Sequence, residues 1–186
     1  MSRLPKISLD SYNPSSSDTL LIDTNILIRL FYPVDFEGSI ETYEILYEKI
    51  RKAKSSLIIS SVQVSEFINR CIRLQFNLYK KSISDQNIDF KRDYRGTNNY
   101  YTNMNAILDI INSDIIPNFT FINDEFGTLS IDNLFIYGFS YDFNDALLVE
   151  IAKKNKAILI TNDKDFGNYG SDIKIVTDNH FLLQFK

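Results

Sequence analysis

The sequence is poor in the residues on which several kinds of chemistry depend. It contains one cysteine, Cys71, and one histidine, His180, among 186 residues. A single cysteine excludes a disulfide within the chain, and the two residues together are too few for a Cys/His zinc cluster. A Ser-His-Asp or Cys-His mechanism would have to use His180, which stands in a polar stretch near the C-terminus and which we expect at the surface.

Long hydrophobic runs are missing as well. The first residues contain no apolar stretch of signal-peptide length, and no segment stays apolar over the roughly 20 residues that a membrane span requires. We therefore expect a cytoplasmic protein that does not enter a membrane. With 44% hydrophobic and 24% charged residues, the chain can form one domain with a sizeable core.

Positive charge is not in excess, since the net charge is −4. This value argues weakly against bulk attraction to nucleic acid. The distribution of charge matters more than the sum. If the acidic residues singled out below share one metal site, the rest of the chain is slightly basic, so a nucleic-acid substrate is not excluded.

Acidic residues follow three of the predicted buried strands. Residues 19–22 lead directly into Asp23, where a short helix is predicted to begin. Residues 57–60 precede a predicted helix over 62–80, with Glu66 in its first turns, and residues 157–160 lead into Asp163 and Asp165. Ligands bind at the carboxyl ends of the strands in open α/β sheets, so these acids are expected at one edge. Taken alone, Glu66 is explained as well by the dipole of its helix.

The alternation of strands and helices predicts the fold class. Further strands are predicted at 119–122 and 173–176, further helices at 39–54 and 101–114, and a short helix or turn at 129–137. The pattern is typical of a three-layer α/β/α sandwich with a central, mostly parallel sheet of about five strands. Residues 1–17 are polar and predicted to be a flexible extension, followed by a single domain over 18–186.

Two more acids stand at the start of a predicted helix over 142–152. Asp142 and Asp145 are three residues apart, so both can lie on one face of its first turn. Asp142 can be explained as the N-cap of this helix. Asp145 stands beside a strongly apolar run and is not explained by capping.

A cluster of four or more carboxylates requires a cation, because the charges otherwise repel one another or become protonated. Ligation by oxygen alone selects hard divalent ions such as Mg²⁺ or Mn²⁺. These ions activate water and stabilise the leaving oxygen in phosphodiester hydrolysis, a reaction that needs neither histidine nor cysteine.

Four motifs, in this order, resemble the PIN-domain nucleases, which include the toxin subunits of the bacterial VapBC toxin–antitoxin systems. They are Asp23-Thr24-Asn25, Ser65-Glu66, Asn144-Asp145-Ala146-Leu147 and Thr161-Asn162-Asp163-Lys164-Asp165-Phe166. The resemblance extends from about residue 19 to residue 177.

The resemblance implies a role for each of these residues. Asp23, Glu66, Asp145 and Asp163 would be the catalytic acids and the metal ligands, with Asp165 as an auxiliary ligand. Asn25 and Thr161 would orient the acids or the attacking water, and Asp142, which has no firm counterpart, is placed beside them. The implied activity is Mg²⁺- or Mn²⁺-dependent cleavage of RNA, usually single-stranded. An antitoxin protein and a second copy of the chain are the implied partners.

Basic and aromatic residues alternate in a predicted insertion around 79–101. Such a mixture suits an RNA strand, because cations meet phosphates and rings stack on bases. A solvated loop between two helices explains the composition equally well, and an oligomer contact is a further alternative. The candidate RNA-binding residues are Lys80, Lys81, Lys91, Arg92, Tyr94 and Arg95.

Three other functions remain open. A DNA-directed, structure-specific nuclease would use the same acids on a different substrate. A catalytically silent PIN-like module would bind RNA or a protein through the segment 79–101. A phosphatase of the haloacid-dehalogenase type also begins from an acid after the first strand, but it needs a second aspartate where this chain has Asn25.

Overall fold

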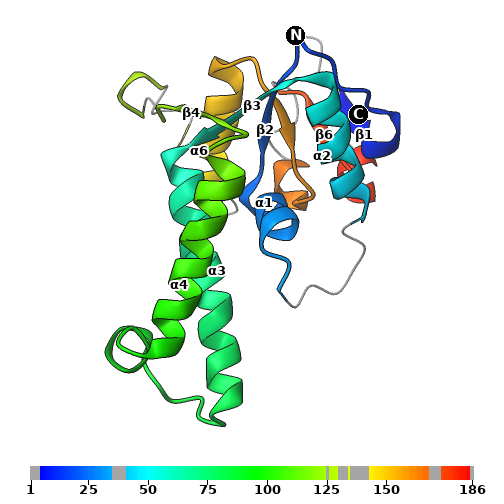
Figure 1. The fold of residues 1–186 in the computed structure, drawn as a ribbon. Coiled ribbons are helices and arrows are strands. Elements are labelled where there is room, and N and C mark those ends of the chain that lie inside the picture. The colour runs from blue at the N-terminus through cyan, green and yellow to red at the C-terminus, as the bar shows by residue number, and fades with distance from the viewer. Residues whose placement is uncertain are drawn as a thin grey trace.

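In the part of the chain that the structure describes, one sheet of six strands forms the centre of the protein, in the order β1-β6-β5-β2-β3-β4 (Figure 1). The structure is a computed structural model that describes residues 5–34, 41–124, 126–129, 134, 143–167 and 173–184. Every strand pairing in the sheet is parallel. The strands are β1 (Lys6–Ser8), β2 (Thr19–Ile22), β3 (Ser56–Ser60), β4 (Thr120–Ile122), β5 (Ile158–Ile160) and β6 (Ile175–Thr177). The predicted parallel α/β fold is confirmed.

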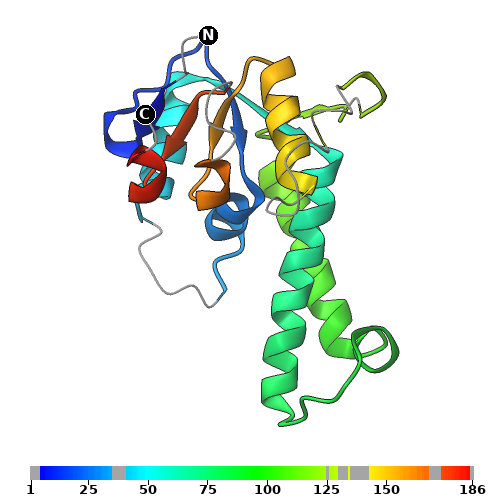
Figure 2. The ribbon, with the colours of Figure 1, turned by 180° about the vertical axis from the view of Figure 1, so that it is seen from behind.

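Helices cover both faces of the sheet. Side chains along a strand alternate between the two faces, so one strand contributes side chains to a core on each side. Leu20 and Ile22 of β2 belong to the larger of two hydrophobic cores. This core also contains side chains of α1 (Thr24–Phe31), α2 (Glu41–Ala53), α3 (Ser61–Ser82) and α4 (Asn98–Ile110). Leu21 lies in the smaller core, against α6 (Phe143–Lys154) on the other face (Figure 2). These are the three predicted layers.

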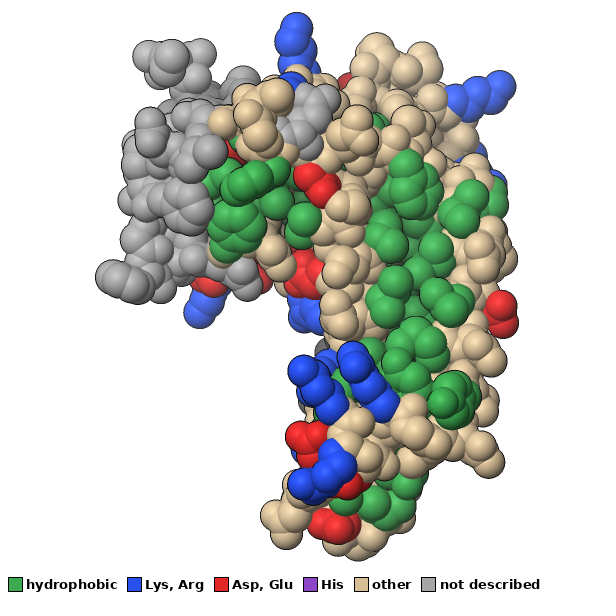
Figure 3. All heavy atoms as spheres, turned by 90° about the vertical axis from the view of Figure 1, so that its left-hand side faces the viewer, with side chains coloured by type: hydrophobic (Ala, Val, Ile, Leu, Met, Phe, Trp, Pro, Cys, Tyr) green, Lys and Arg blue, Asp and Glu red, His purple; other side chains and the backbone are tan. Residues whose placement is uncertain are grey.

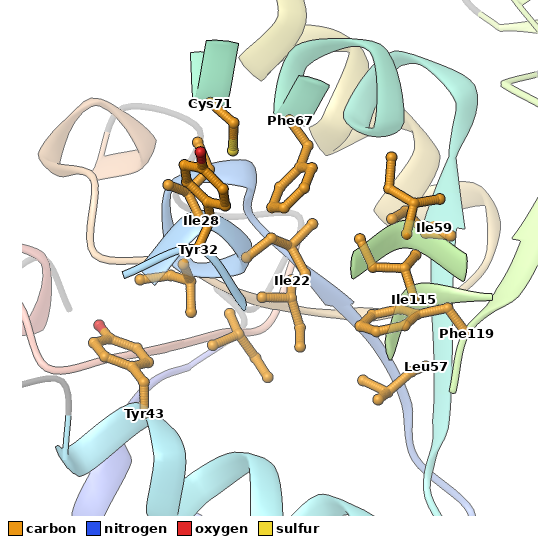
Figure 4. Close-up of a cluster of buried hydrophobic side chains, with 14 of the residues drawn as sticks. Ile22, Ile28, Tyr32, Tyr43, Leu57, Ile59, Phe67, Cys71, Ile115 and Phe119 are labelled. Atoms are coloured by element: carbon orange, nitrogen blue, oxygen red, sulfur yellow. The ribbon is translucent and has the colours of Figure 1, made fainter. Parts of the chain in front are cut away.

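The larger core holds the elements of the candidate site in place. Figure 4 shows Ile22 of β2, Ile28 of α1 and Phe67 of α3 directed toward one another. Ile59 of β3 and Phe67 are fully buried, and Ile22 and Ile28 are each 2% exposed. Truncating a buried side chain of this kind typically lowers the free energy of unfolding by about 2–5 kcal/mol. The close packing of these side chains therefore holds β2, α1 and α3 in fixed positions relative to one another.

The first strand corrects one prediction. β1 pairs with β6, with Lys6 opposite Ile175, and the residues after it, Leu9 and Tyr12, are buried in the larger core. The Tyr12 hydroxyl donates to Asp18 at 2.8 Å. Residues 5–17 therefore belong to the folded domain and are not a loosely attached extension.

The predicted insertion forms the end of a helical arm. α3 and α4 run side by side and extend well beyond the sheet (Figure 1), and π-helical turns lie at Phe90–Tyr94 (η2) and Ile111–Ile115 (η3). The rings of Phe76, Phe90 and Tyr94 lie 5.2–5.8 Å apart at their centroids. These rings form the aromatic core of the arm, which is continuous with the larger hydrophobic core, so the segment is more than a solvated loop.

Short helices complete the described residues. They are η1 (Leu9–Ser11), η4 (Phe126–Thr128), η6 (Lys164–Gly167) and α7 (His180–Gln184). His180 is exposed at the start of α7, as the sequence predicts. The helix or turn predicted over 129–137 lies largely outside the described residues. Among the helices that are described, none combines the length and the hydropathy that a membrane span requires.

Candidate functional site

The carboxyl edge of the sheet gathers the predicted acids from four segments. All strands are parallel, so the residues after β2 and β5 emerge at the same edge, and these are Asp23 and Asp163. α3 begins directly after β3 and carries Glu66 in its second turn. α6 leads back to the start of β5, so its first turn, with Asp145, lies at this same edge.

Asp23 occupies the point where β2 becomes α1. It is the N-cap of α1, and its carboxylate accepts a hydrogen bond from the backbone N–H of Asn25 at 3.3 Å. Its own N–H donates to the carbonyl of Ile160 in β5 at 2.9 Å. The residue is only 5% exposed, so its position is fixed by two neighbouring strands and by the helix.

Thr161 connects Asp23 to the segment after β5. Its hydroxyl donates to Oδ2 of Asp23 at 2.7 Å and accepts the backbone N–H of Asp163 at 3.0 Å. Asp163 in turn accepts the backbone N–H of Asp165 on Oδ1 at 3.0 Å. One buried hydroxyl therefore orients the carboxylate of Asp23 and the backbone of Asp163 together.

Asn25 lies between two of the acids. Its side-chain amide is 3.5 Å from Oδ2 of Asp23 and 3.5 Å from Oδ2 of Asp163, at the long limit for hydrogen bonds. The amide therefore bridges the carboxylates that follow β2 and β5. A second aspartate at this position, as the phosphatase alternative requires, would add a third negative charge here.

Glu66 reaches the same site from α3. The Thr24 hydroxyl donates to its Oε2 at 3.0 Å, and Nη1 of Arg70 lies 3.3 Å from its Oε1. Thr24 is buried and directly precedes Asn25, so two consecutive residues contact acids on two different segments, Glu66 in α3 and Asp163 after β5. The Glu66 side chain is 26% exposed and has one oxygen oriented by α1 and the other by its own helix.

Gln63 fixes the start of α3 against the end of β2. Its side-chain amide donates to the carbonyl of Ile22 at 2.6 Å, while its oxygen accepts the backbone N–H of Ser60 at 3.1 Å. Ser60 and Gln63 form the capping box of α3. This buried pair sets the distance between the helix that carries Glu66 and the strand that ends at Asp23.

Burial and neighbouring charge both act on Asp23. The pKa of its carboxyl group is raised from 3.8 to about 6, mainly by burial and also by the negative charges of Asp163 and Glu66. The hydrogen bonds from Thr161 and from the backbone of Asn25 act in the opposite direction. Without a bound cation, the ionised form of Asp23 is therefore destabilised in the folded protein, and a nearby cation would stabilise it.

The donors at this edge fit a hard divalent cation, because the acids offer only oxygen and one of them is buried. As the side chains stand, no group of three acidic, histidine or cysteine residues in the described part of the chain is close enough to hold a metal ion. Asp145 is partly buried in the first turn of α6, and Asp142 lies outside the described residues. The roles of Asp23, Glu66, Asp145, Asp163 and Asp165 as metal ligands, and of Asp142 beside them, stay predictions.

Three positioning residues escaped the sequence analysis. Gln63 and Thr24 are polar yet almost completely buried, at 1% exposure each, and Arg70 pairs with Glu66. The local signals for them are the place of Thr24 directly after Asp23, the capping-box spacing of Ser60 and Gln63, and the spacing of four residues between Glu66 and Arg70.

The candidate RNA-binding residues of the insertion have different surroundings. Tyr94 is fully buried in the arm, and its hydroxyl donates to Asn99 at 2.9 Å, so its ring offers no face to a base. This corrects its assignment as an RNA contact. Arg92 forms an ion pair with Asp93 at 2.8 Å, and the Arg95 guanidinium lies 5.4 Å from the centroid of the Phe90 ring. Lys80 lies on α3, and Lys81 and Lys91 are exposed.

Comparisons with known proteins agree with this arrangement. The family model of the PIN domain matches residues 20–171, so the chain belongs to the PIN-domain family. No curated protein sequence matches the chain.

Two solved structures share the fold. VapBC2 from Rickettsia felis, bound to a DNA fragment from its promoter, is 18% identical with a TM-score of 0.51, covering 86% of this chain and 98% of its own. FitAcB from Neisseria gonorrhoeae is 15% identical with a TM-score of 0.51, covering 87% of this chain and 99% of its own.

Proposed function

We propose that the protein is a metal-dependent endoribonuclease whose active site is the carboxyl edge of the sheet. PIN domains are generally nucleases, and this chain belongs to that family. The observation that carries the proposal is the buried Asp23, joined through Thr161 and Asn25 to Asp163, with Glu66 held beside it by Thr24. A silent binding module has no need to keep a carboxylate buried at a cost in stability.

The acids that would hold Mg²⁺ or Mn²⁺ are Asp23, Glu66, Asp145 and Asp163, with Asp165 beside them. When bound, the ion supplies positive charge for the scissile phosphate and makes a coordinated water more acidic. Thr161 and Thr24 hold the carboxylates of Asp23 and Glu66 in fixed directions. One of the acids would accept the proton of the attacking water.

The proposal is tested by cleavage of matched single-stranded RNA and DNA with Mg²⁺, with Mn²⁺ or with EDTA. We expect cleavage of RNA that requires the metal and that falls by about 100-fold or more in Asp23→Asn and in Asp145→Asn. The matched control is Asp10→Asn, because Asp10 is exposed and follows β1, which two strands separate from β2 and Asp23. Undiminished cleavage by both variants would refute the metal site, and cleavage of DNA alone would favour the DNA-directed nuclease.

The likeness of this fold to VapBC2 supports a second part of the proposal, that the chain is a cytoplasmic toxin with an antitoxin partner. The most economical observation is the neighbouring gene. A small DNA-binding protein encoded beside this chain, which binds it and inhibits RNA cleavage, would support the assignment. A chain that cleaves RNA but slows no growth when expressed alone would contradict it.

A homodimer is the remaining proposed partner, and the arm offers a surface for it. Tyr101 and Leu108 are seven residues apart on α4 and are 57% and 41% exposed, and Ile116 beyond them is 50% exposed. Figure 3 shows hydrophobic side chains in a band along the arm. We expect a dimer in sedimentation equilibrium that Leu108→Glu dissociates, with Ile83→Glu at the tip of the arm as a control. A monomeric wild type would contradict this proposal.

A further inference from the structure

A groove between α1 and α3 begins where the acidic site ends. It has a volume of about 560 Å³, and among its described lining residues are three arginines and four asparagines but no acid. Six of these polar residues matter here, namely Asn25, Arg29, Asn69, Arg70, Arg73 and Asn77. Guanidinium and amide groups donate hydrogen bonds to phosphate oxygens, so the groove is suited to an anionic chain.

Two residues connect the groove directly to the acids. The side-chain amide of Asn25, which contacts Asp23 and Asp163, also lines the groove. Arg70 lines the groove and pairs with Glu66 at 3.3 Å. An anionic polymer bound in the groove would therefore extend directly into the acidic site.

The groove lies along a polar stripe on α3. Glu66, Arg70, Arg73, Asn77 and Lys80 follow one another at intervals of four, three, four and three residues, which places them on one face of the helix. The stripe spans about 21 Å at the usual rise of a helix. The stripe begins at a proposed metal ligand, and α3, which carries it, extends outward along the arm (Figure 1).

The aromatic core of the arm holds the outer cations in place. The Arg73 guanidinium lies 3.9 Å from the centroid of the Phe90 ring, and Nζ of Lys80 lies 5.0 Å from that of Phe76. Such cation–π contacts limit the motion of long side chains while leaving their outer donors available. Arg73 and Asn77 are exposed, so their polar groups face the solvent along the stripe.

We propose that this groove and stripe bind the sugar–phosphate backbone of single-stranded RNA on one side of the scissile phosphate, from the acids toward the tip of the arm. The proposal rests on the function proposed above and names the part of the protein that holds its substrate. A single line of cations between two helices matches one strand, whereas a duplex presents phosphates on two strands.

The test separates binding from cleavage. The affinity of a labelled single-stranded RNA is measured by fluorescence anisotropy in EDTA over a range of salt concentrations. We expect Arg73→Gln/Lys80→Gln to weaken binding about tenfold at low salt and to reduce the salt slope by about 1.4. The matched control, Lys49→Gln/Lys52→Gln, removes two exposed charges from α2 and is expected to change the affinity less than twofold.

The charge-preserving variant Arg73→Lys/Lys80→Arg shows whether a loss of binding reflects charge, and thermal unfolding shows that each variant is folded. We expect Arg73→Lys/Lys80→Arg to bind the RNA with an affinity within about threefold of that of the wild type. An Arg73→Gln/Lys80→Gln variant that binds like the wild type, or a wild type that prefers duplex RNA, overturns the proposal. Matched single-stranded DNA is expected to bind through the same residues, because the groups in the groove recognise phosphate.

Cleavage with Mn²⁺ is measured on the same proteins, so that the two proposals can fail separately. If Asp23→Asn abolishes cleavage and Arg73→Gln/Lys80→Gln binds and cleaves normally, the nuclease stands and the groove is refuted. If the wild type binds RNA through Arg73 and Lys80 but cleaves nothing, the groove stands and the nuclease is refuted.

Discussion

The hydroxyl of Thr161 lies 2.7 Å from Oδ2 of Asp23 and donates to it in the interior of the protein. The donor follows β5 and the acceptor follows β2, which are neighbouring strands in the sheet, although the two residues lie 138 positions apart in the chain. This hydrogen bond stabilises the ionised form of a carboxylate that burial opposes.

Replacing Thr161 with valine is expected to raise the pKa of Asp23 above about 6, because the buried carboxylate loses its donor. Metal-dependent cleavage should fall about 10–100-fold at neutral pH, and its pH profile should shift to higher pH. The measurement is the rate of RNA cleavage against pH. Thr161→Ser keeps the hydroxyl and should restore the profile, whereas a uniform loss of rate in both variants would point to a structural defect alone.

Asp23→Asn is expected to stabilise the metal-free protein at neutral pH. The pKa of Asp23 is raised from 3.8 to about 6, so the folded state binds more protons than the unfolded state between these values. Stability is therefore lost as the pH rises through this range, and the full cost, about 3 kcal/mol at most, applies above it. The asparagine variant should gain about 1–3 kcal/mol at pH 7 in EDTA and almost nothing at pH 4.

Urea unfolding of the wild type and Asp23→Asn at these two pH values checks the sign. A variant that is less stable at pH 7 than the wild type would contradict the raised pKa. Added Mn²⁺ should stabilise only the wild type, because ions that bind the folded state alone shift the unfolding equilibrium.

Leu9 tests whether the first residues belong to the fold. It is 5% exposed in the larger core, next to β1. Leu9→Ala is expected to lower the free energy of unfolding by about 2 kcal/mol or more. Its neighbour Asp10 is exposed, so Asp10→Ala should change stability by less than about 0.5 kcal/mol. Equal free energies of unfolding for the two variants would instead support the prediction that the first residues are a loosely attached extension.

Tyr94 tests whether the aromatic residues of the arm are structural. Tyr94→Phe removes the hydroxyl that donates to Asn99 and should cost about 1 kcal/mol of stability, with no change in RNA affinity. Tyr94→Ala should cost about 3–5 kcal/mol, because the ring is fully buried. Weaker RNA binding by Tyr94→Phe at unchanged stability would show that this residue contacts the substrate.

The two central strands β2 and β5 can be predicted because their apolar runs fill the core. Residues 19–22 and 157–160 are recognisable because both faces of the sheet are covered, so consecutive side chains are apolar. β1 escapes this reasoning, because its three residues, Lys-Ile-Ser, carry little signal and its pairing partner β6 is distant in the chain. Whether these residues form a strand depends on their pairing with β6, which no local pattern shows.

The site shows the same division between local and nonlocal information. Asp23 and Asp163 can be found because each follows a buried strand, and parallel strands end at one edge. The contact of Thr24 with Glu66 depends on how α1 packs on α3, which no local pattern encodes. The sequence alone does not place Tyr94 in the core, because basic and aromatic residues are equally typical of an RNA-binding surface and of the core of a small helical arm.

Binding of Mn²⁺ to the purified protein, followed by titration calorimetry, tests the central claim most directly. The account predicts that the wild type and the control Asp10→Asn bind Mn²⁺, and that Asp23→Asn and Asp163→Asn bind it at least about tenfold more weakly. It would be contradicted by a wild type that binds no Mn²⁺, or by Asp23→Asn and Asp163→Asn variants that bind it as tightly as the wild type.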